Sequence, residues 1–385
     1  MNKPSFRHTL HRSLYTNGEE TDYDYIRLAK KCSELTFNKD FLNPQFNPAP
    51  HQTPFNEIIG TKAKDVIKSE YDCIFEPQLV TKLNVPEFAM QLKNIVKEYF
   101  LQVWDSNKNH IVFHSAGYDS RIISIVLMEL REEKGSDWIG QIHFRCHQPE
   151  CDDFNEIMKR EGWDKSQYSC WEGSEKDYYD VGRKEVVLNG FVSYVQQMNF
   201  WSDIIPLEEE KHWVVITGVG DTIYKDFTLK KKYKTNLDEK FNYSMLDAIT
   251  TASNLWNGIW ECMWLSRFND LLLPFFGYEY LKISLTANMN DLKWIDTTDN
   301  IRKAIIESNN YGVDFNGINY GRHNYVWNIS ENRQKQMIED YYNSEFFNKI
   351  GVEINETELF ENMGGWDAKL WGFMTAFDAI INQSN

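Results

Sequence analysis

The chain has 385 residues, more than one typical domain, and a formal charge of −16. Hydrophobic residues make up 42%, aromatic residues 15% and charged residues 25%, a composition that excludes a disordered or collagen-like chain and predicts about two globular domains. Acidic residues are spread along the sequence, and such a surface repels phosphate backbones, which argues against direct nucleic-acid binding as the main function.

The sequence shows no secretory leader and no apolar stretch of the roughly 18 residues that a membrane span needs. The six cysteines are thinly scattered: Cys32, Cys73, Cys146, Cys151, Cys170 and Cys262. This usage predicts reduced thiols in a soluble, cytoplasmic protein with no membrane partner.

Residues 1–85 read as an N-terminal cap or lead-in region. Residues 43–54, NPQFNPAPHQTP, contain four prolines and few periodic apolar positions, which argues against a long helix or a central strand there.

Residues 86–235 alternate helical and strand patterns. An amphipathic helix at 86–104 leads into the strand HIVFH at 110–114, and an apolar helix follows that Gly135 ends. The further elements expected are a strand at 138–144, a helix at 151–163, and strands at 168–171 and 213–217. This order predicts an α/β domain with a parallel sheet, right-handed crossovers and ligands at the carboxyl ends of the strands.

Beyond about residue 235 the strand signals stop. Helical patterns such as LLLPFFGYEYLKISL and WDAKLWGFMTAFDAII dominate to the end of the chain, so residues 236–385 are expected to form a helical C-terminal domain.

The corner between the first strand and its helix reads IVFHSAGYDSR at 111–121. A strand that ends at a helix N-terminus directs backbone N–H groups and the positive end of the helix dipole at one spot. Ser115 and Ser120 add hydroxyl groups, while Ala116 and Gly117 allow a ligand close to the backbone. These residues predict a cradle for a phosphate or pyrophosphate.

Asp119 repels a phosphate unless both bind the same divalent cation, and Mg²⁺ takes one or two carboxylates together with phosphate oxygens. Asp221, in TGVGDT at the end of another strand, is placed to supply the second carboxylate. Asp119 and Asp221 are therefore the expected metal ligands.

Other interpretations of the corner fit less well or stay open. The phosphate-binding motif G-x-x-x-x-G-K-[ST] and the nucleophile elbow G-x-S-x-G are absent, and GVGDTI has Ile223 where a dinucleotide fingerprint needs a third glycine. A structural corner in which Asp119 or Ser120 caps the helix stays open.

The cluster HFRCHQPEC at 143–151 lacks the second ligand pair of a zinc site.

The stretch HSAGYDSR resembles the S-G-G-x-D-S pyrophosphate loop of the N-type ATP pyrophosphatases, the PP-loop superfamily, and its form with a following Arg is similar to the synthetase domain of asparagine synthetases. Further landmarks keep the family order over residues 86–305: a helix before the loop, QIHFRC where the family contacts adenine, an acidic helix start, TGVGDTIY, and LLLPFFGYEYL. The resemblance implies an adenine-nucleotide-binding domain of the HUP-like class.

The resemblance also implies site residues. Ser115, Gly117, Asp119 and Ser120 would hold pyrophosphate and its magnesium, with Ala116, Tyr118 and Arg121 completing the loop. Gly218, Gly220 and Asp221 would form the second loop, and Arg302 would be catalytic together with Asp119 and Asp221.

This sequence also departs from the family pattern. Ala116 replaces a Gly, Val219 an acidic residue, and Thr222 the usual Glu or Asp, while Gly277 replaces an Asp. Thr298 stands where a lysine stabilises the departing pyrophosphate, and Lys303, Lys293 or Arg121 are the possible substitutes.

The expected function is an ATP- and Mg²⁺-dependent ligase that adenylates a small-molecule carboxylate and transfers ammonia or an amine to it. The first 85 residues lack the N-terminal cysteine of a glutaminase domain, so the nitrogen would come from ammonia, an amine or a separate glutaminase partner. The alternatives are a PP-loop enzyme that modifies a tRNA or nucleobase, and an ATP-binding or interaction protein without turnover.

Overall fold

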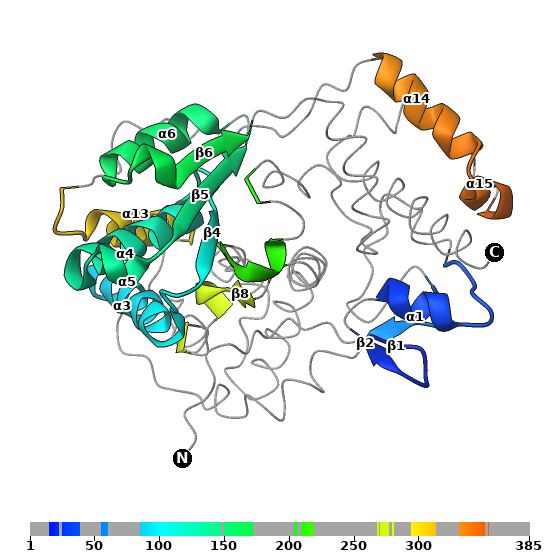
Figure 1. Ribbon diagram of the computed structural model, residues 1–385, viewed down its shortest axis with the longest axis horizontal. Coiled ribbons are helices and arrows are strands. Elements are labelled where there is room, and N and C mark those ends of the chain that lie inside the picture. The colour runs from blue at the N-terminus through cyan, green and yellow to red at the C-terminus, as the bar shows by residue number, and fades with distance from the viewer. Residues whose placement is uncertain are drawn as a thin grey trace.

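The centre of the protein is a five-stranded parallel sheet in the order β6-β5-β4-β7-β8 (Figure 1). Its strands are β4 (Asn109–Phe113), β5 (Ile142–His147), β6 (Tyr168–Trp171), β7 (Trp213–Thr217) and β8 (Asp270–Leu272). The computed structural model describes residues 15–22, 25–38, 55–60, 85–147, 150–171, 204–205, 209–218, 268, 270–276, 279–280, 294–312, 331–350 and 353.

Strand β4 lies between β5 and β7 and is parallel to both. Phe113 is level with Arg145 of β5 and with Thr217 of β7. From β4 the chain proceeds outward to β5 and β6, and later returns to add β7 and β8 on the other side of β4. Numbered along the chain, the strand order is 3-2-1-4-5, a Rossmann-like arrangement whose direction reverses between β4 and β7.

The helices α3 (Val85–Val103), α4 (Tyr118–Lys134), α6 (Cys151–Arg160) and α13 (Trp294–Glu307) contribute to one hydrophobic core with the sheet (Figure 1). Alternate strand residues, such as Val112, Phe144 and Ile216, contribute to this core. The neighbouring residues on β4 and β7 are buried as well, which is the pattern of central parallel strands covered on both faces.

A buried ion pair joins three of these helices. Lys93 Nζ of α3 lies 2.5 Å from Glu129 Oε1 of α4 and also donates to the carbonyl oxygen of Ser308, just after α13, at 3.0 Å. Because an unpaired charge is costly in a core, this network restricts how α13 can lie against α3 and α4.

The structure confirms the parallel α/β architecture and corrects two element assignments. Strand β8 lies beyond residue 235, where no strand was expected, and it pairs with β7. Both β8 and α13 belong to the α/β unit although their residues fall in the range expected to form a helical C-terminal domain.

The strand expected at 138–144 begins only at Ile142. Ser136–Ile139 forms the short helix α5, and Gly140, at φ 62°, ends it. A positive φ is unfavourable for residues other than glycine, so this turn separates α5 from β5.

The N-terminal region contains a small antiparallel sheet. Its strands are β1 (Tyr15–Thr16), β2 (Thr21–Asp22) and β3 (Ile59–Gly60), with α1 (Tyr25–Lys31) following β2. Two further helices, α14 (Glu331–Tyr342) and α15 (Glu345–Ile350), lie near the C-terminus. The expected domain boundary at residue 85 stays a prediction.

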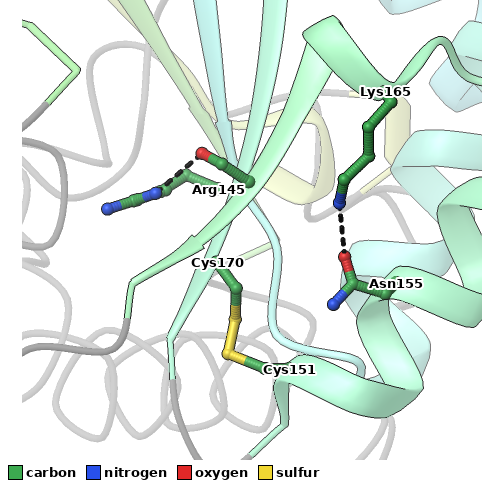
Figure 2. Close-up of a disulfide and its surroundings, with 6 residues drawn as sticks. Arg145, Cys151, Asn155, Lys165 and Cys170 are labelled. Carbon is green, nitrogen blue, oxygen red and sulfur yellow. Dashed lines mark hydrogen bonds between the residues drawn. A yellow bond between two sulfur atoms is a disulfide. The ribbon is translucent and has the colours of Figure 1, made fainter.

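Cys151 and Cys170 form a disulfide, so the expectation that all six cysteines are reduced is wrong (Figure 2). Cys151 begins α6 and Cys170 lies on β6, with their Cα atoms 5.7 Å apart, well within the range that a disulfide spans. The bond also leaves Cys151 without a free thiolate, so it is not available as a metal ligand in the HFRCHQPEC stretch. Among the described residues, no helix is long and apolar enough to cross a membrane.

We predict that reduction destabilises the protein by about 3 kcal/mol, because the bond constrains the unfolded chain between residues separated by 19 positions. Urea unfolding with and without dithiothreitol measures the difference. Cys170→Ser should abolish it, whereas Cys32→Ser, at a cysteine outside the bond, should leave it unchanged. A peptide map without reductant that recovers Cys151 and Cys170 as separate thiols would contradict the pairing.

His110 makes the fold sensitive to acid. Its ring is buried and stacks on Trp104 with ring centroids 3.9 Å apart, and burial lowers the pKa of His110 to about 4. In the unfolded chain His110 binds a proton near pH 6.5, whereas in the folded chain it binds one only near pH 4. Stability is therefore lost as pH falls from about 6.5 toward 4, by about 1.4 kcal/mol per pH unit.

We predict that His110→Phe, which retains a ring against Trp104, reduces the loss of stability over this pH range. Urea unfolding at pH 7, 6 and 5 compares the variant with the parent. His212→Asn alters an exposed histidine and serves as the control. Equal pH slopes for the parent and His110→Phe would show that His110 is not the group responsible.

Candidate functional site

The loop at 114–117 connects the central strand β4 to α4 at the carboxyl edge of the sheet. Gly117 is the N-cap residue of α4, with extended backbone (φ −70°, ψ 160°) and no side-chain cap hydrogen bond. Asp119 and Ser120 lie inside the first turn of the helix. The interpretation of the corner as one capped by Asp119 or Ser120 is therefore wrong, and their side chains have other partners.

The two serines close the loop on itself. The backbone N–H of Ser115 donates to Ser120 Oγ at 3.1 Å, and the two hydroxyl oxygens are 3.0 Å apart. A second bond runs from the Arg121 N–H to the Gly117 carbonyl oxygen at 3.0 Å. Ser115 and Gly117 are half-buried, while Ala116 and Ser120 are buried. The loop is thus compact and brings both hydroxyl groups to one position.

Gly218, directly after β7, lies against this loop. A Cβ atom on Gly218 would be 3.1 Å from the backbone carbon and Cβ of Asp119 and 3.1 Å from the backbone nitrogen of Ser120. Only a glycine allows this approach without displacing the start of α4. The structure therefore brings the first predicted loop together with the beginning of the second, while Gly220 and Asp221 lie outside the described residues.

Asp119 pairs with Arg302. Arg302 Nε on α13 lies 3.4 Å from Asp119 Oδ1, and the two side chains are 3% and 22% exposed. Two residues that the family resemblance implied separately as catalytic are therefore in contact. The carboxylate keeps a partly exposed side at the edge of the sheet, where a cation or phosphate could approach it.

The structure places two of the residues that could replace the lysine of the family pattern, Arg121 and Lys303. The Arg121 side chain is fully buried, and its positive charge acts on His114 and Glu161 beneath the loop. Lys303 is 41% exposed and lies 3.8 Å from Glu307 on the outside of α13. Neither arrangement places a flexible cation over the loop. Lys293 and the side chain of Thr298 lie outside the described residues.

Two further predicted features lie beside the loop. Tyr118 is partly buried against the hydrophobic core at the start of α4. The stretch expected to contact adenine forms β5, directly beside β4.

Sequence reasoning missed a buried polar network under the loop. His114 Nε2 lies 3.3 Å from Ser124 Oγ, and Ser124 Oγ donates to Glu161 Oε1 at 2.9 Å. Trp163 Nε1 donates to Glu161 Oε2 at 3.1 Å. His114 directly follows β4, Ser124 lies on α4, and Glu161 and Trp163 follow α6, so no local periodicity reveals them. The one available signal was a histidine and a serine flanking the loop on either side.

Burial controls the protonation of this network. It lowers the pKa of His114 to about 3, with a further contribution from the charge of Arg121, so this imidazole is neutral. Burial also raises the pKa of Glu161 to about 7, although Ser124, Arg121 and Trp163 oppose the rise. Glu161 accordingly changes charge near neutral pH.

No protein-family model matches this chain, and no curated protein matches it significantly in sequence. Within the part of the chain that the structure describes, no cluster of three or more His, Cys, Asp or Glu side chains could hold a metal ion. Asp221, the expected second ligand, lies outside that part.

We predict that Gly218→Ala displaces the start of α4, because the added methyl group meets backbone atoms of Asp119 and Ser120. The expected cost is about 1–3 kcal/mol, with faster amide hydrogen exchange at residues 115–121. Val215→Ala, at a buried position of the same strand, should lower stability through a cavity without this local effect. Unchanged exchange at 115–121 in Gly218→Ala would contradict the close approach.

Proposed function

We propose that this chain is an ATP-dependent, AMP- and pyrophosphate-forming ligase of the asparagine synthetase-like type. The observation that carries the proposal is the contact between Asp119 and Arg302 beside Gly218. It lies where the strand order reverses, and open α/β sheets bind ligands in the crevice at that point.

The chain's own residues fit a magnesium–pyrophosphate group. Asp119 would be a metal ligand, Asp221 the expected second one, and the Ser115 and Ser120 hydroxyl groups would contact phosphate oxygens. Ala116 and Gly117 leave room for a phosphate at the backbone, and the first turn of α4 has no side-chain cap over its N–H groups. Bound Mg²⁺ would neutralise charge on the departing pyrophosphate.

Arg302 supports the same chemistry. Its guanidinium is buried and directed at Asp119, so it adds fixed positive charge where negative charge develops on the leaving group. Because the Arg302 side chain is already held in place, it does not have to rearrange when the reaction occurs. It is therefore better placed than Lys303 or Arg121 for the role of the missing family lysine.

In the proposed reaction a carboxylate oxygen of the substrate attacks the α-phosphorus of ATP and pyrophosphate leaves. Ammonia or an amine then attacks the acyl carbon, a C–N bond forms, and AMP leaves. The protein positions the reactants and stabilises the leaving group. ATP and Mg²⁺ are the proposed cofactors, with a small carboxylic acid and a nitrogen donor as substrates.

ATP–pyrophosphate exchange against a panel of small carboxylic acids tests the proposal. We expect exchange with at least one acid, and AMP and pyrophosphate as the products. Asp119→Asn should lower exchange by about 100-fold or more, with the fold checked by circular dichroism. Asp137→Asn, at an exposed position on α5, is the control and should leave the rate unchanged.

Three outcomes would count against the proposal. Release of ADP and phosphate would exclude AMP-forming chemistry. Exchange at the parent rate in Asp119→Asn would remove the metal assignment. ATP binding without exchange on any acid would favour a nucleotide-binding protein that lacks turnover.

A further inference from the structure

Two contacts connect the chain at the end of β4 to helix α4, on the two sides of the loop that joins them. At the level of the loop, the Ser115 N–H and hydroxyl meet Ser120 Oγ at 3.1 and 3.0 Å. One layer deeper, His114 Nε2 meets Ser124 Oγ at 3.3 Å. Both contacts join the end of β4 to α4, and the deeper one lies between two buried residues.

The deeper contact rests on Glu161. Ser124 has one hydroxyl hydrogen, and its shortest contact with an acceptor is that with Glu161 Oε1, at 2.9 Å. When Glu161 is ionised and accepts that hydrogen, Ser124 Oγ accepts from His114 Nε2–H. This assigns the neutral Nε2–H tautomer to His114, in agreement with its lowered pKa.

Glu161 is itself held in place. Trp163 Nε1 donates to its other carboxylate oxygen at 3.1 Å. Arg131 of α4 lies 4.4 Å above the Trp163 ring and donates to the carbonyl oxygen of Gly162 at 3.0 Å. The chain after α6 is thus fastened to α4 at a second level, which gives Ser124 a fixed acceptor.

We propose that His114, Ser124 and Glu161 form a buried clamp that positions the 115–120 loop for its anion. They are positioning residues, since none of them is among the residues 115–120 that are expected to contact the anion. The clamp sets the spacing between β4 and α4, and through it the relative placement of Ser115, Ser120 and Asp119. The choice of pyrophosphate as probe rests on the proposed function, whereas the clamp's effect on loop geometry does not.

The chain provides a matched control on the same helix. Glu129 of α4 is also a buried carboxylate with a hydrogen-bonded partner, Lys93. It lies toward the opposite end of α4 from the loop. Removing either carboxylate leaves a buried polar partner without its acceptor, but only Glu161 connects to the residues on the two sides of the loop.

The test compares Glu161→Ala and Ser124→Ala with Glu129→Ala. Calorimetry measures affinity for magnesium pyrophosphate, and hydrogen exchange measures opening of the amides at 115–121. We expect both clamp variants to lose affinity on the order of tenfold or more and to exchange faster at 115–121. Glu129→Ala should unfold more readily than the parent but keep the parent affinity and loop exchange.

A conservative variant separates positioning from charge. In Glu161→Gln the amide oxygen accepts from Trp163, the amide N–H₂ donates to Ser124 Oγ, and the Ser124 hydroxyl donates to the Arg121 carbonyl oxygen, 3.2 Å away. All the contacts of the clamp are then satisfied, so affinity and loop exchange should return to within about threefold of the parent. Glu161→Gln, together with Ser124→Ala, also provides the comparison if Glu161→Ala fails to fold.

Each result decides a distinct point. Equal loop exchange in the Glu161→Ala, Ser124→Ala and Glu129→Ala variants would overturn the clamp, whatever their stability. Faster loop exchange in the clamp variants, with no pyrophosphate or ATP binding by the parent, would support the clamp and reject the proposed function. Glu161→Gln behaving like Glu161→Ala would assign the effect to charge and also overturn positioning by hydrogen bonds.

Discussion

The pairing of β4 with two parallel neighbours is the constraint on which the site depends. Strands β5 and β7 fix the end of β4 from both sides, so the loop that follows can leave the sheet in one direction only. The same pairing brings the end of β7 to the start of α4, where Gly218 leaves space for backbone contact. Two segments separated by almost a hundred residues thereby lie side by side at the carboxyl edge of the sheet.

Helix α13 contributes a second constraint, through charge. Arg302 in its C-terminal half pairs with Asp119, and Lys93, paired with Glu129, donates to the carbonyl oxygen of Ser308 just past its C-terminal end. Buried charges are poor sources of stability but strong sources of geometric specificity when each has a partner. An apolar α13 could slide along α3 and α4, whereas these paired charges define its position relative to the loop.

The local pattern of the chain predicted most of the sheet. Continuous apolar runs identified β4 and β7, and the helical apolar period identified α3 and α4, because each of these elements is long or strongly patterned. Strand β8 was missed because three residues, Asp270–Leu272, precede Pro274 within an apolar run that reads equally as a helix. The run at 138–144 was read as one strand because Gly140 alone does not reveal the short helix before it.

The loop residues were predictable because they are contiguous. The partners of those residues were not, since they depend on which distant segments the fold brings together. The sequence contains no local signal that Arg302 meets Asp119; only the family resemblance placed both in one site. Glu161 beneath Ser124 and the Cys151–Cys170 bond were missed altogether, because each joins elements whose contact follows from the crossover geometry.

The strand order also determines when the crevice can exist. Strands β4, β5 and β6 are joined through short helical connections and lie within about sixty residues, so their contacts close small loops early in folding. Gly218 and Arg302 come from much later in the chain. During synthesis from the N-terminus, residues 115–120 are therefore made long before the two residues that pack against them. The candidate site therefore joins an early half and a late half of the chain, and its contacts are complete only after residue 302 has left the ribosome.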